Sequence, residues 1–432
     1  MRYRCYMLIV PLVLLSKVTH SDDGPTGARH LSLKQAVAHA LAHSPMLAAA
    51  GHQVDADTAR LNGNPGFPNP ALSVEVEDFL GSGVAHGVDG AQVTTALSQD
   101  VPLGGKVDAR RRVNTAKQAV SIVERDIAEQ LLMTDVSIAF LEVLAEQRRM
   151  VNADEMVALA QATLDAIALQ VEAGRATGIE VDKAAIVLSL AKLDADRVTR
   201  DLVAAKQRLA SACGESTPFF DDVLGTLDHI APLPDMAALL KRVDNHPLLL
   251  VRTAELRQQQ AMLALEKASR VPDLSLSVGY RWLNATSDSA LVAGVAVPLP
   301  LADRNEGPIG AASHEVLKSQ KQGNTERVAL FQSITEIFQL LASEHNRASV
   351  LKKEIYPKAL STFEAVNEGY RIGRFGYLDL IDAQRTLFEI KEQTLEALVA
   401  YHRTAIRLNQ TAALAMSPSR FESSAGKGDV AP

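Results

Sequence analysis

Two carboxylates late in the chain have the spacing that most clearly suggests chemistry. Asp379 and Asp382 follow a glycine-rich corner and are three residues apart, so on a helix they lie on one face. Glu180 takes the place of Asp379 after an earlier corner, where Lys183 replaces the second acid. Carboxylates gathered in a ring favour cations and repel anions. The alternative is that these acids only interact with the dipole at a helix N-terminus.

The other chemical patterns in the sequence are weaker. We find no phosphate-binding loop, no metal-ligand cluster and no nucleophile elbow. His39 and His43 have a helical spacing that a metal would accept, but with 11 histidines in the chain such a pair arises easily by chance. Glu75 and Glu77 share one face of a strand, where we interpret them as pore lining rather than an acid–base pair. We therefore expect no enzymatic activity, no cofactor and no metal site.

The elements that carry these residues occur twice in the chain. Gly174-Arg175 and the helix-like stretch after it return as Gly373-Arg374, 199 positions later. Three further anchors return in the same order, with Pro45, Pro70 and Val101 matched by Pro247, Pro272 and Val297. Four anchors at nearly one offset predict two tandem copies of a unit of about 200 residues, covering 22–230 and 231–416.

The two ends of the chain are predicted to lie outside these copies. Residues 1–21 have a positive start, a short apolar core and a small-residue cleavage region, the pattern of a signal peptide. A membrane anchor is the alternative, although the apolar run 5–15 is shorter than the ~20 residues of a membrane span. Residues 417–432, rich in Ser, Pro, Gly and charge, are predicted to be disordered.

Export would set the charge and the thiol content of the mature chain. Loss of Arg2, Arg4 and Lys17 from 44 basic residues leaves 41 against 51 acidic ones, a formal charge of −10. An acidic exported protein is a poor candidate for binding nucleic acid. Loss of Cys5 leaves Cys213 as the single cysteine, so no intramolecular disulfide can form.

Alternating apolar and polar residues predict two β-hairpins, one in each copy. Each strand has about the 9–11 residues that a tilted strand needs to cross hydrocarbon. Tyr280 and Trp282 lie near the loop end of their strand, as aromatic residues at a membrane interface do. The alternative is two hairpins of a soluble sandwich. The predicted strands cover 72–80, 91–101, 274–283 and 290–299.

Most of the remaining chain has helical periodicity. The predicted long helices cover 106–171, 180–212, 310–372 and 378–415. The first would be a rod of roughly 100 Å at 1.5 Å per residue. Gly323 and Pro357 are expected to break the third. With only 4% aromatic residues, such helices suit an extended coiled-coil-like wall rather than a globular core.

Four strands cannot close a barrel, yet lipid does not tolerate open sheet edges. Two chains would supply eight strands and three would supply twelve. Eight strands leave an interior filled by side chains, which makes poor use of a polar inner face. The sequence therefore predicts a mixed α and β membrane protein, a homotrimer with a 12-stranded β-barrel, four strands per chain, continued by a long α-helical barrel.

Three segments resemble the TolC-like outer membrane efflux proteins. They are 101–106, 297–305 and 369–384, and the last two are most similar to the CzcC-like branch that serves divalent-metal efflux. The resemblance covers 31–415 in the same order. It implies a trimeric barrel in the outer membrane of a Gram-negative bacterium and a helical barrel crossing the periplasm. It also implies docking onto a periplasmic membrane-fusion adaptor and an inner-membrane RND-type pump.

Proline-containing segments are predicted to connect strands to long helices, because proline fits a strand end or a first helical turn. These transition residues are Pro102, Gly104, Gly105, Pro298, Pro300, Asp303 and Asn305. An ordinary turn before a helix is the alternative.

The glycine corners are predicted to be the far tips of the helical hairpins. The resemblance implies that these tips meet the adaptor, whereas the residues alone are equally compatible with solvated loops. The tip residues are Gly174, Arg175, Thr177, Gly178, Gly373, Arg374, Gly376 and Tyr377.

The resemblance also implies a gate at these tips. Acids at the positions of Asp379 and Asp382 line a narrow periplasmic entrance in the family, with Glu180 as the counterpart in the first repeat. Tyr370 matches an aromatic gate position, but Phe375 stands where a basic residue is common. The function expected is a passive duct for divalent metal cations. The alternatives are the same channel serving drug efflux or type I protein secretion, or a periplasmic coiled-coil adaptor or scaffold.

Overall fold

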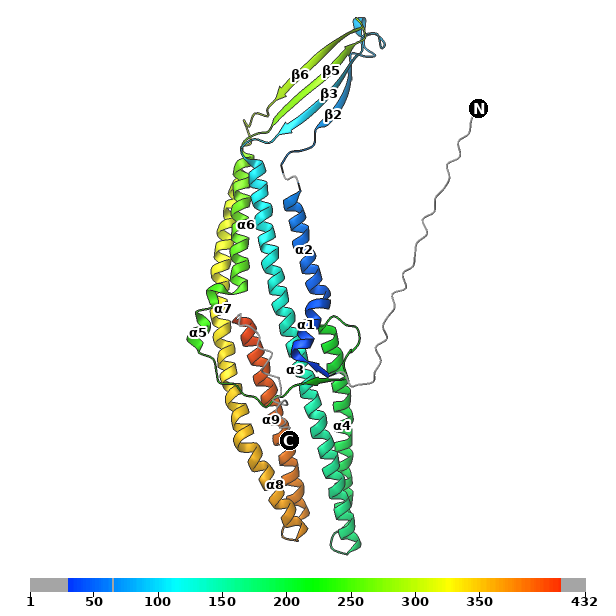
Figure 1. Cartoon of the computed structure of the whole chain (residues 1–432), viewed down its shortest axis with the longest axis vertical. Helices are drawn as coiled ribbons and strands as arrows, with labels where there is room; N and C mark the ends of the chain where they lie inside the picture. The colour runs from blue at the N-terminus through cyan, green and yellow to red at the C-terminus, as the bar shows by residue number, and fades with distance from the viewer. Residues whose placement is uncertain (1–29, 64–65, 413–432) are drawn as a thin grey trace, which may run out of the picture.

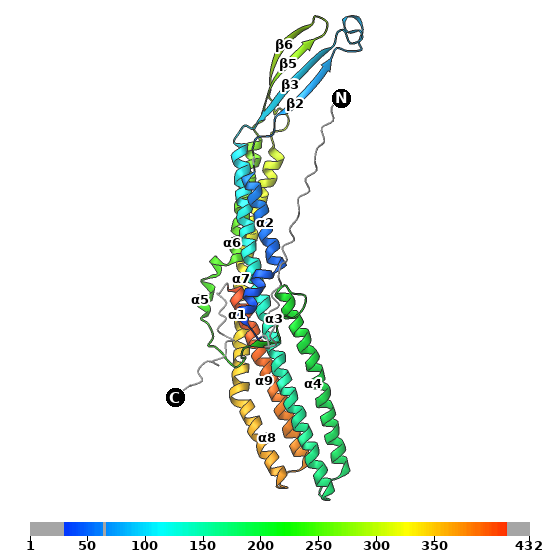
Figure 2. The same cartoon turned by 45° about the vertical axis from the view of Figure 1, so that its right-hand side comes forward.

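The computed structural model describes residues 30–63 and 66–412. The expected signal peptide, 1–21, and the expected disordered tail, 417–432, lie outside these residues. The chain forms one elongated body, with a β-sheet at one end and the corners of two helical hairpins at the other (Figures 1 and 2). Long helices run along the axis between these ends.

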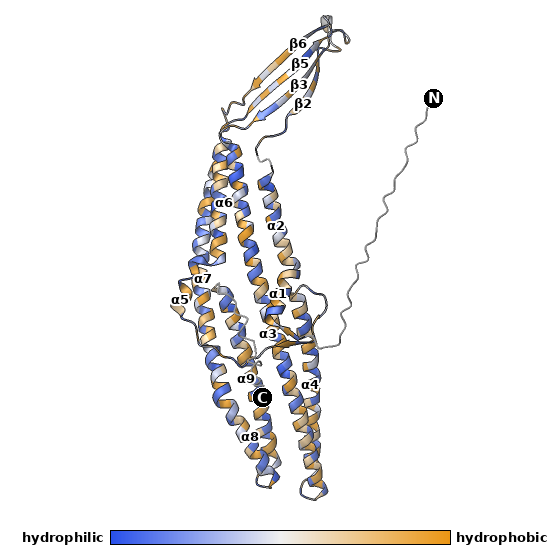
Figure 3. Ribbon diagram, viewed as in Figure 1, coloured by the Kyte–Doolittle hydropathy of each residue, from blue (hydrophilic) through white to orange (hydrophobic). Residues whose placement is uncertain are grey.

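The sheet has four antiparallel strands in the order β2-β3-β5-β6. Each hairpin predicted from the sequence is present, and pairing of β3 with β5 joins them, from Gln92 opposite Leu283 to Val101 opposite Leu274. Large apolar side chains on this sheet are exposed, up to 84% for Leu291. Along each strand apolar and polar residues mix (Figure 3). The four strands are β2 (Ala71–Glu77), β3 (Gln92–Val101), β5 (Leu274–Leu283) and β6 (Asp288–Ala296).

Two strand boundaries differ from the prediction. The strand expected at 72–80 ends at Glu77, because Asp78 and Leu80 have left-handed backbone angles, with φ of 56° and 58°. The strand expected at 290–299 covers Asp288–Ala296 and stops before Pro298, which cannot donate to a ladder. The sandwich alternative is wrong for the described residues, since the one other sheet is the two-stranded pair β1-β4.

The long helices form two hairpins. The first consists of α3 (Lys106–Glu172) and α4 (Gly178–Ala212), which confirms the predicted boundaries to within two residues. The second descends through α7 (Glu306–Val350), a π-helical segment (Leu351–Ile355) and α8 (Tyr356–Arg371), and returns as α9 (Tyr377–Thr411).

One of the two expected helix breaks is present. Gly323 lies inside the continuous α7, so the break predicted there is wrong. A single glycine costs a helix only about 1 kcal/mol relative to alanine, which a 45-residue helix tolerates. Pro357 follows the π-helical segment and occupies the first turn of α8, where a missing N–H is tolerated.

Shorter elements complete each half. Proline starts a helix at Pro45 and again at Pro247, the positions that anchor the sequence repeat. α2 packs against α3, and α6 packs between α3 and α7. The shorter helices are α1 (Leu33–His43), α2 (Pro45–Asn62), α5 (Met236–Leu240) and α6 (Pro247–Ser269), and the strands are β1 (His30–Ser32) and β4 (Asp222–Leu224).

The largest hydrophobic core lies midway along the body, where α1, α3, α7 and α9 meet the segment between α4 and α5. Phe140 and Leu408 are among its fully buried side chains. A second, smaller core lies near the tips around Ile167 and Leu380. In the described part of the chain, no helix has the length and hydrophobicity needed to cross a membrane.

Candidate functional site: helical tips, strand junctions and a charged cavity

The strand-to-helix junctions of the two halves share one backbone conformation. Gly105 and Asn305 each precede a long helix in the left-handed conformation, with φ of 73° and 60°. Pro102 directly follows β3, and Pro298 and Pro300 lie between β6 and α7. The turn residues predicted from the sequence therefore lie where the chain changes from strand to rod.

Polar contacts hold the first junction to the segment between α6 and β5, and the second to the end of α6. The buried Lys106 ammonium pairs with Asp273, whose carboxylate also accepts the Leu103 N–H at 3.2 Å. In the other half, the Asn305 amide donates to the Glu266 carboxylate at 2.8 Å. The Asp303 carboxylate accepts the Asn305 N–H at 2.8 Å.

Close packing also restricts Gly104. Its φ is +71°, and a Cβ added there would lie 2.7 Å from Val271. This position therefore needs glycine for both conformation and space.

The two tips have matching corners. Gly174 and Gly373 adopt left-handed angles, with φ of 69° and 76°. The Arg175 N–H donates to the Gln170 carbonyl at 2.8 Å, and the Arg374 N–H donates to the Gly369 carbonyl at 2.7 Å. The tip residues Thr177, Gly178 and Gly376 are exposed, as are these glycines and arginines. Tyr377 differs, because the residue is only 8% exposed and packs in the core near the tips.

A tyrosine connects the two tips. The Tyr370 hydroxyl donates to the side-chain oxygen of Gln170, at 3.1 Å, across from one hairpin to the other. Burial raises the pKa of Tyr370 and of Tyr377, and the negative charge of Glu180 raises both further. Both phenols are therefore neutral at ordinary pH, and the Tyr370 hydroxyl is able to donate its hydrogen bond.

The predicted gate acids cap and flank their helices. The Asp379 carboxylate accepts the Gly376 N–H at 2.9 Å, and the Glu180 carboxylate accepts the Thr177 N–H at 3.3 Å. The helix-terminus role, the alternative for these acids, is therefore real for both. Asp382 is exposed and pairs with Arg385 at 2.8 Å. Asp379 and Asp382 line one groove between α8 and α9.

α9 carries its acids on a face turned away from the segment between α4 and α5. That segment contacts α9 through Tyr401, whose hydroxyl bonds the Ala231 backbone, and through His402, which bonds the Leu227 carbonyl at 2.9 Å. Positions seven apart share a helix face. Exposed acids with this spacing extend the line of the tip carboxylate along α9, namely Asp382, Glu389 and Glu396.

The strand acids are part of a polar row across the sheet. Glu75 lies opposite Thr94, which lies opposite Arg281 on β5. The Arg281 guanidinium donates to the Thr94 hydroxyl at 2.9 Å and lies 3.5 Å from the Glu77 carboxylate. Arg281 was not among the predicted site residues, although its alternation with apolar neighbours gives it the same face.

The two histidines of the predicted pair lie side by side on α1. The His39 and His43 rings stack with centroids 4.1 Å apart, and His39 bonds Glu215 at 2.9 Å. His43 bonds the His39 carbonyl through Nδ1. Across residues 30–63 and 66–412, no group of three or more His, Cys, Asp or Glu side chains is placed to hold a metal ion.

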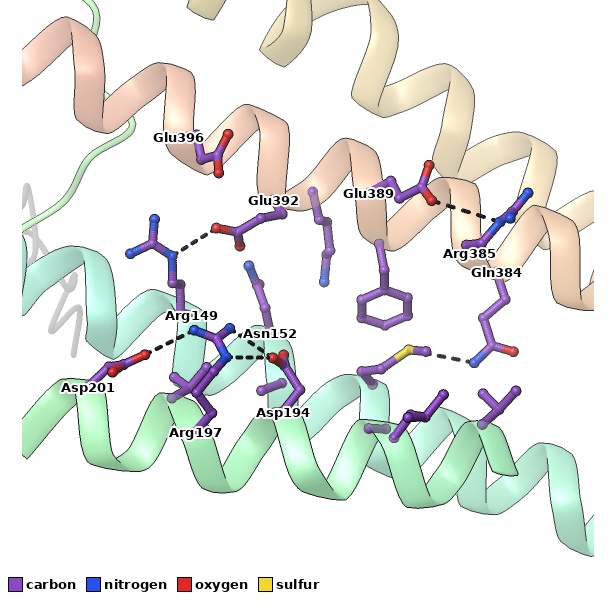
Figure 4. A pocket seen from close by; sticks show the side chains of 18 of the residues that line it. Arg149, Asn152, Asp194, Arg197, Asp201, Gln384, Arg385, Glu389, Glu392 and Glu396 are labelled. Carbon is purple, nitrogen blue, oxygen red and sulfur yellow. Dashed lines mark hydrogen bonds and ion pairs between the residues drawn. The ribbon is translucent and has the colours of Figure 1, made fainter. Parts of the chain in front are cut away.

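A charged cavity lies near the tips. No sequence pattern predicted it, because the residues that line it come from three helices that are far apart in the chain. It has a volume of about 710 Å³ and lies between α3, α4 and α9 (Figure 4). Arg197 bridges Asp194 and Asp201 on α4, and Arg149 of α3 donates to Glu392 of α9. Gln384 reaches from α9 to the Met156 sulfur at 3.7 Å.

The architecture is that of a TolC-like outer membrane channel. It has strands at one end, paired tips at the other and a line of acids along the returning helix. The family model described as "Outer membrane efflux protein" matches residues 36–215 and 241–413. The chain belongs to the outer membrane efflux protein family, and its location is the outer membrane, from which it extends into the periplasm. Channels of this family act as trimers with periplasmic adaptors and inner-membrane pumps.

Curated relatives align with most of the chain. The chain is 29% identical to the cobalt-zinc-cadmium resistance protein CzcC of Cupriavidus metallidurans over 404 residues, 91% of this chain and 94% of that one. It is 26% identical to the nickel and cobalt resistance protein CnrC of the same organism over 312 residues, 72% of each.

Solved structures share the fold. A crystal structure of CusC superposes with a TM-score of 0.74 at 17% identity, covering 91% of this chain and 95% of that one. VceC from Vibrio cholerae gives a TM-score of 0.72 at 18% identity, covering 88% and 95%. At these identities the likeness concerns the fold alone.

Proposed function

We propose that three copies of this chain form a passive duct, with a 12-stranded barrel in the outer membrane and a helical barrel in the periplasm. The observation that carries this proposal is the four-stranded sheet, which exposes apolar side chains and ends in two edges, β2 and β6. Open edges are not tolerated in lipid, so neighbouring copies must pair with them. The two tandem repeats, 22–230 and 231–416, would each supply one hairpin and two rods.

The cargo we propose is divalent heavy-metal cations such as cobalt, zinc and cadmium. Support comes from the relatives, whose names describe resistance to these metals, and from the exposed acids along α9. A duct of this kind needs neither cofactor nor catalytic group, since a partner pump supplies the energy. The same channel serving drug efflux or protein secretion is the second candidate. The adaptor or scaffold alternative lacks support, because the family consists of channels.

Deleting the gene tests the cargo. In a strain without a redundant exporter, loss of the channel should lower tolerance to zinc, cobalt and cadmium several-fold, because the partner pump would lose its exit. Growth is measured over a series of concentrations of each metal and of several drugs, with the complemented strain as the control. Unchanged metal tolerance combined with new drug sensitivity would replace the metal assignment with drug efflux.

The tips are proposed to be both the gate and the adaptor contact. Asp379, Asp382 and Glu180 of three chains would surround the periplasmic entrance. Tyr370 would hold the two hairpins of each chain together in the closed state through its bond to Gln170. The exposed corner residues would meet the adaptor, whereas Tyr377 would support them from inside the tip.

Tyr370→Phe tests the proposed link. The ring and its packing remain, but a hydrogen bond of about 0.5–1.5 kcal/mol between the hairpins is lost. We expect more frequent or larger channel openings in planar bilayers. Tyr401→Phe is the matched control, because it removes a tyrosine bond to Ala231 far from the tips. Equal conductance of Tyr370→Phe and wild type would exclude Tyr370 as part of the gate.

A further inference from the structure

The charged cavity between α3, α4 and α9 contacts both helical hairpins. α3 and α4 form the first hairpin, and α9 belongs to the second. Side chains from all three helices surround the same space (Figure 4). Its volume of about 710 Å³ lies within the range of small-molecule sites, about 300–1,000 Å³. A molecule held there would therefore touch both hairpins at once.

Negative charge predominates in the lining of this cavity. Six carboxylates and four basic side chains line it. Each basic side chain already pairs with a carboxylate, as Arg197 does with Asp194 and Asp201 (Figure 4). Glu396 is exposed and forms no ion pair within the described residues. The lining therefore has a surplus of negative charge that a cation would neutralise.

A buried amide lines the part of the cavity nearest the tips. Gln384 of α9 is only 1% exposed, and its Nε2 donates to the Met156 sulfur. Its Oε1 is buried and has no hydrogen-bond partner among the described residues. A buried acceptor without a donor costs folding free energy. Because Gln384 lines the cavity, a ligand that carries an N–H group can supply the missing donor.

The spacing of residues along α9 sets the length of a ligand that joins this amide to an acid. Glu392 follows Gln384 by eight residues, which is about 12 Å along the helix axis. Phe388 lies between them on the same helix face, four residues from each. The Lys391 ammonium lies 5.5 Å from the centroid of the Phe388 ring, so this ring already contacts one cation. An elongated cation could therefore lie along α9.

The lining does not suit a bare metal ion. In the part of the chain that the structure describes, no group of three or more His, Cys, Asp or Glu side chains is placed to hold one. The carboxylates of the cavity come from three helices, with apolar side chains such as Leu190 and Ile381 among them. This mixture suits an organic cation with an apolar body.

We propose that the cavity binds an elongated diamine or polyamine. One ammonium group donates to the Gln384 Oε1, and a second lies near Glu392. The methylene chain between them covers apolar surface at Phe388 and Leu190, as the stem of a lysine does. Nine bonds between two nitrogen atoms equal three residues of extended chain, about 10–11 Å. This length is close to the separation of Gln384 and Glu392 along α9.

The consequence for the channel rests on the proposed duct. Glu389 and Glu396 line the cavity and also belong to the exposed line of acids along α9. In a trimer the cavity would therefore open towards the duct. A bound diamine would join the two hairpins of one chain, as the bond from Tyr370 to Gln170 does, and would favour the closed tips.

Two diamines of equal charge test the site. The full-length protein in non-ionic detergent is titrated by calorimetry with 1,8-diaminooctane, which has nine bonds between its nitrogen atoms, and with 1,4-diaminobutane, which has five. The longer diamine should bind about tenfold more tightly, because only it reaches from Gln384 to Glu392. Equal affinities would indicate non-specific attraction to an acidic protein and overturn the proposal. The uncharged 1,8-octanediol should not bind, and binding as tight as that of the diamine would also overturn it.

Gln384→Leu tests the buried acceptor. Leucine fills a similar space but accepts no hydrogen bond, so 1,8-diaminooctane should bind about tenfold more weakly. The melting temperature should not fall, because an acceptor without a partner is replaced by an apolar side chain. Gln393→Leu is the matched control, since Gln393 is exposed on the same helix and does not line the cavity. Unchanged diamine binding by Gln384→Leu would overturn the proposal.

Planar-bilayer recordings test the effect on the tips. Addition of 1,8-diaminooctane to the periplasmic side should lower the current of the wild type more than that of Gln384→Leu. Equal reduction in both proteins would overturn the effect on the tips. A protein that binds the diamine but forms no channel would overturn the proposed function and leave the site, whereas a channel that does not bind the diamine would overturn the site alone.

Discussion

Replacing both tip acids, Asp379→Asn with Asp382→Asn, should weaken block of the channel by divalent cations about tenfold or more. The reason is electrostatic: three chains would lose six carboxylates from one ring, and such a ring attracts cations in proportion to its charge. A tenfold change in the affinity of the blocking cation corresponds to about 1.4 kcal/mol of binding free energy. This is a small share of the electrostatic attraction that six carboxylates in a narrow entrance exert on a divalent cation. Block is measured as the fall in planar-bilayer current when cobalt or zinc is added to the periplasmic side.

Asparagine is the informative replacement because Asp379 also caps its helix. An amide oxygen can still accept the Gly376 N–H, so the variant loses charge but keeps the cap. The chain offers a matched control, Asp235→Asn with Asp244→Asn. Asp235 caps α5 and Asp244 pairs with Arg327, both far from the tips. Equal block in all three proteins would leave the helix cap as the role of Asp379 and remove the gate.

Phe140→Ala should be the most destabilising simple substitution, costing about 3–5 kcal/mol of folding free energy. Phe140 is fully buried in the core at the middle of the body, where it joins residues from α1, α4 and α9. Removing the ring leaves a cavity among helices that cannot collapse independently. We expect a clear fall in the melting temperature of the detergent-solubilised protein and less trimer in the outer membrane.

Leu131→Ala provides the comparison on the same helix. Leu131 is 41% exposed, so its truncation should change the melting temperature little. Equal melting temperatures for Phe140→Ala and Leu131→Ala would show that the core midway along the body does not limit the stability of the protein.

The sequence was most informative where one local rule sets the structure. Alternation along 274–283 predicted β5 at its observed boundaries, because a period of two matches the side-chain repeat of a strand and not that of a helix. Glycine corners predicted both tips, since Gly174 and Gly373 supply the left-handed angle that ends a helix. The junctions at Gly105 and Asn305 were predicted from the prolines before them, because proline fits a strand end or a first helical turn.

The rest depended on contacts between distant segments. β1 and β4 have three residues each and pair across a separation of 192 positions, too short for any periodic signal. The bond from Tyr370 to Gln170 depends on how two hairpins are placed side by side. The break predicted at Gly323 failed because neighbouring α6 supports α7 there, so packing outweighs a local propensity of about 1 kcal/mol.

α3 runs without a break from the strand junction at Lys106 to the corner after Glu172. The length of this protein can therefore change only in steps that preserve the orientation of the two ends of α3. Each residue inserted into that rod would turn everything below it by about 100° and lower it by about 1.5 Å. Additions of seven or eleven residues, matched in the rods beside it, would return both ends to within about 20° of the same orientation. Natural or engineered versions that reach across a wider periplasm should therefore be longer by such additions, made in all four rods at one height.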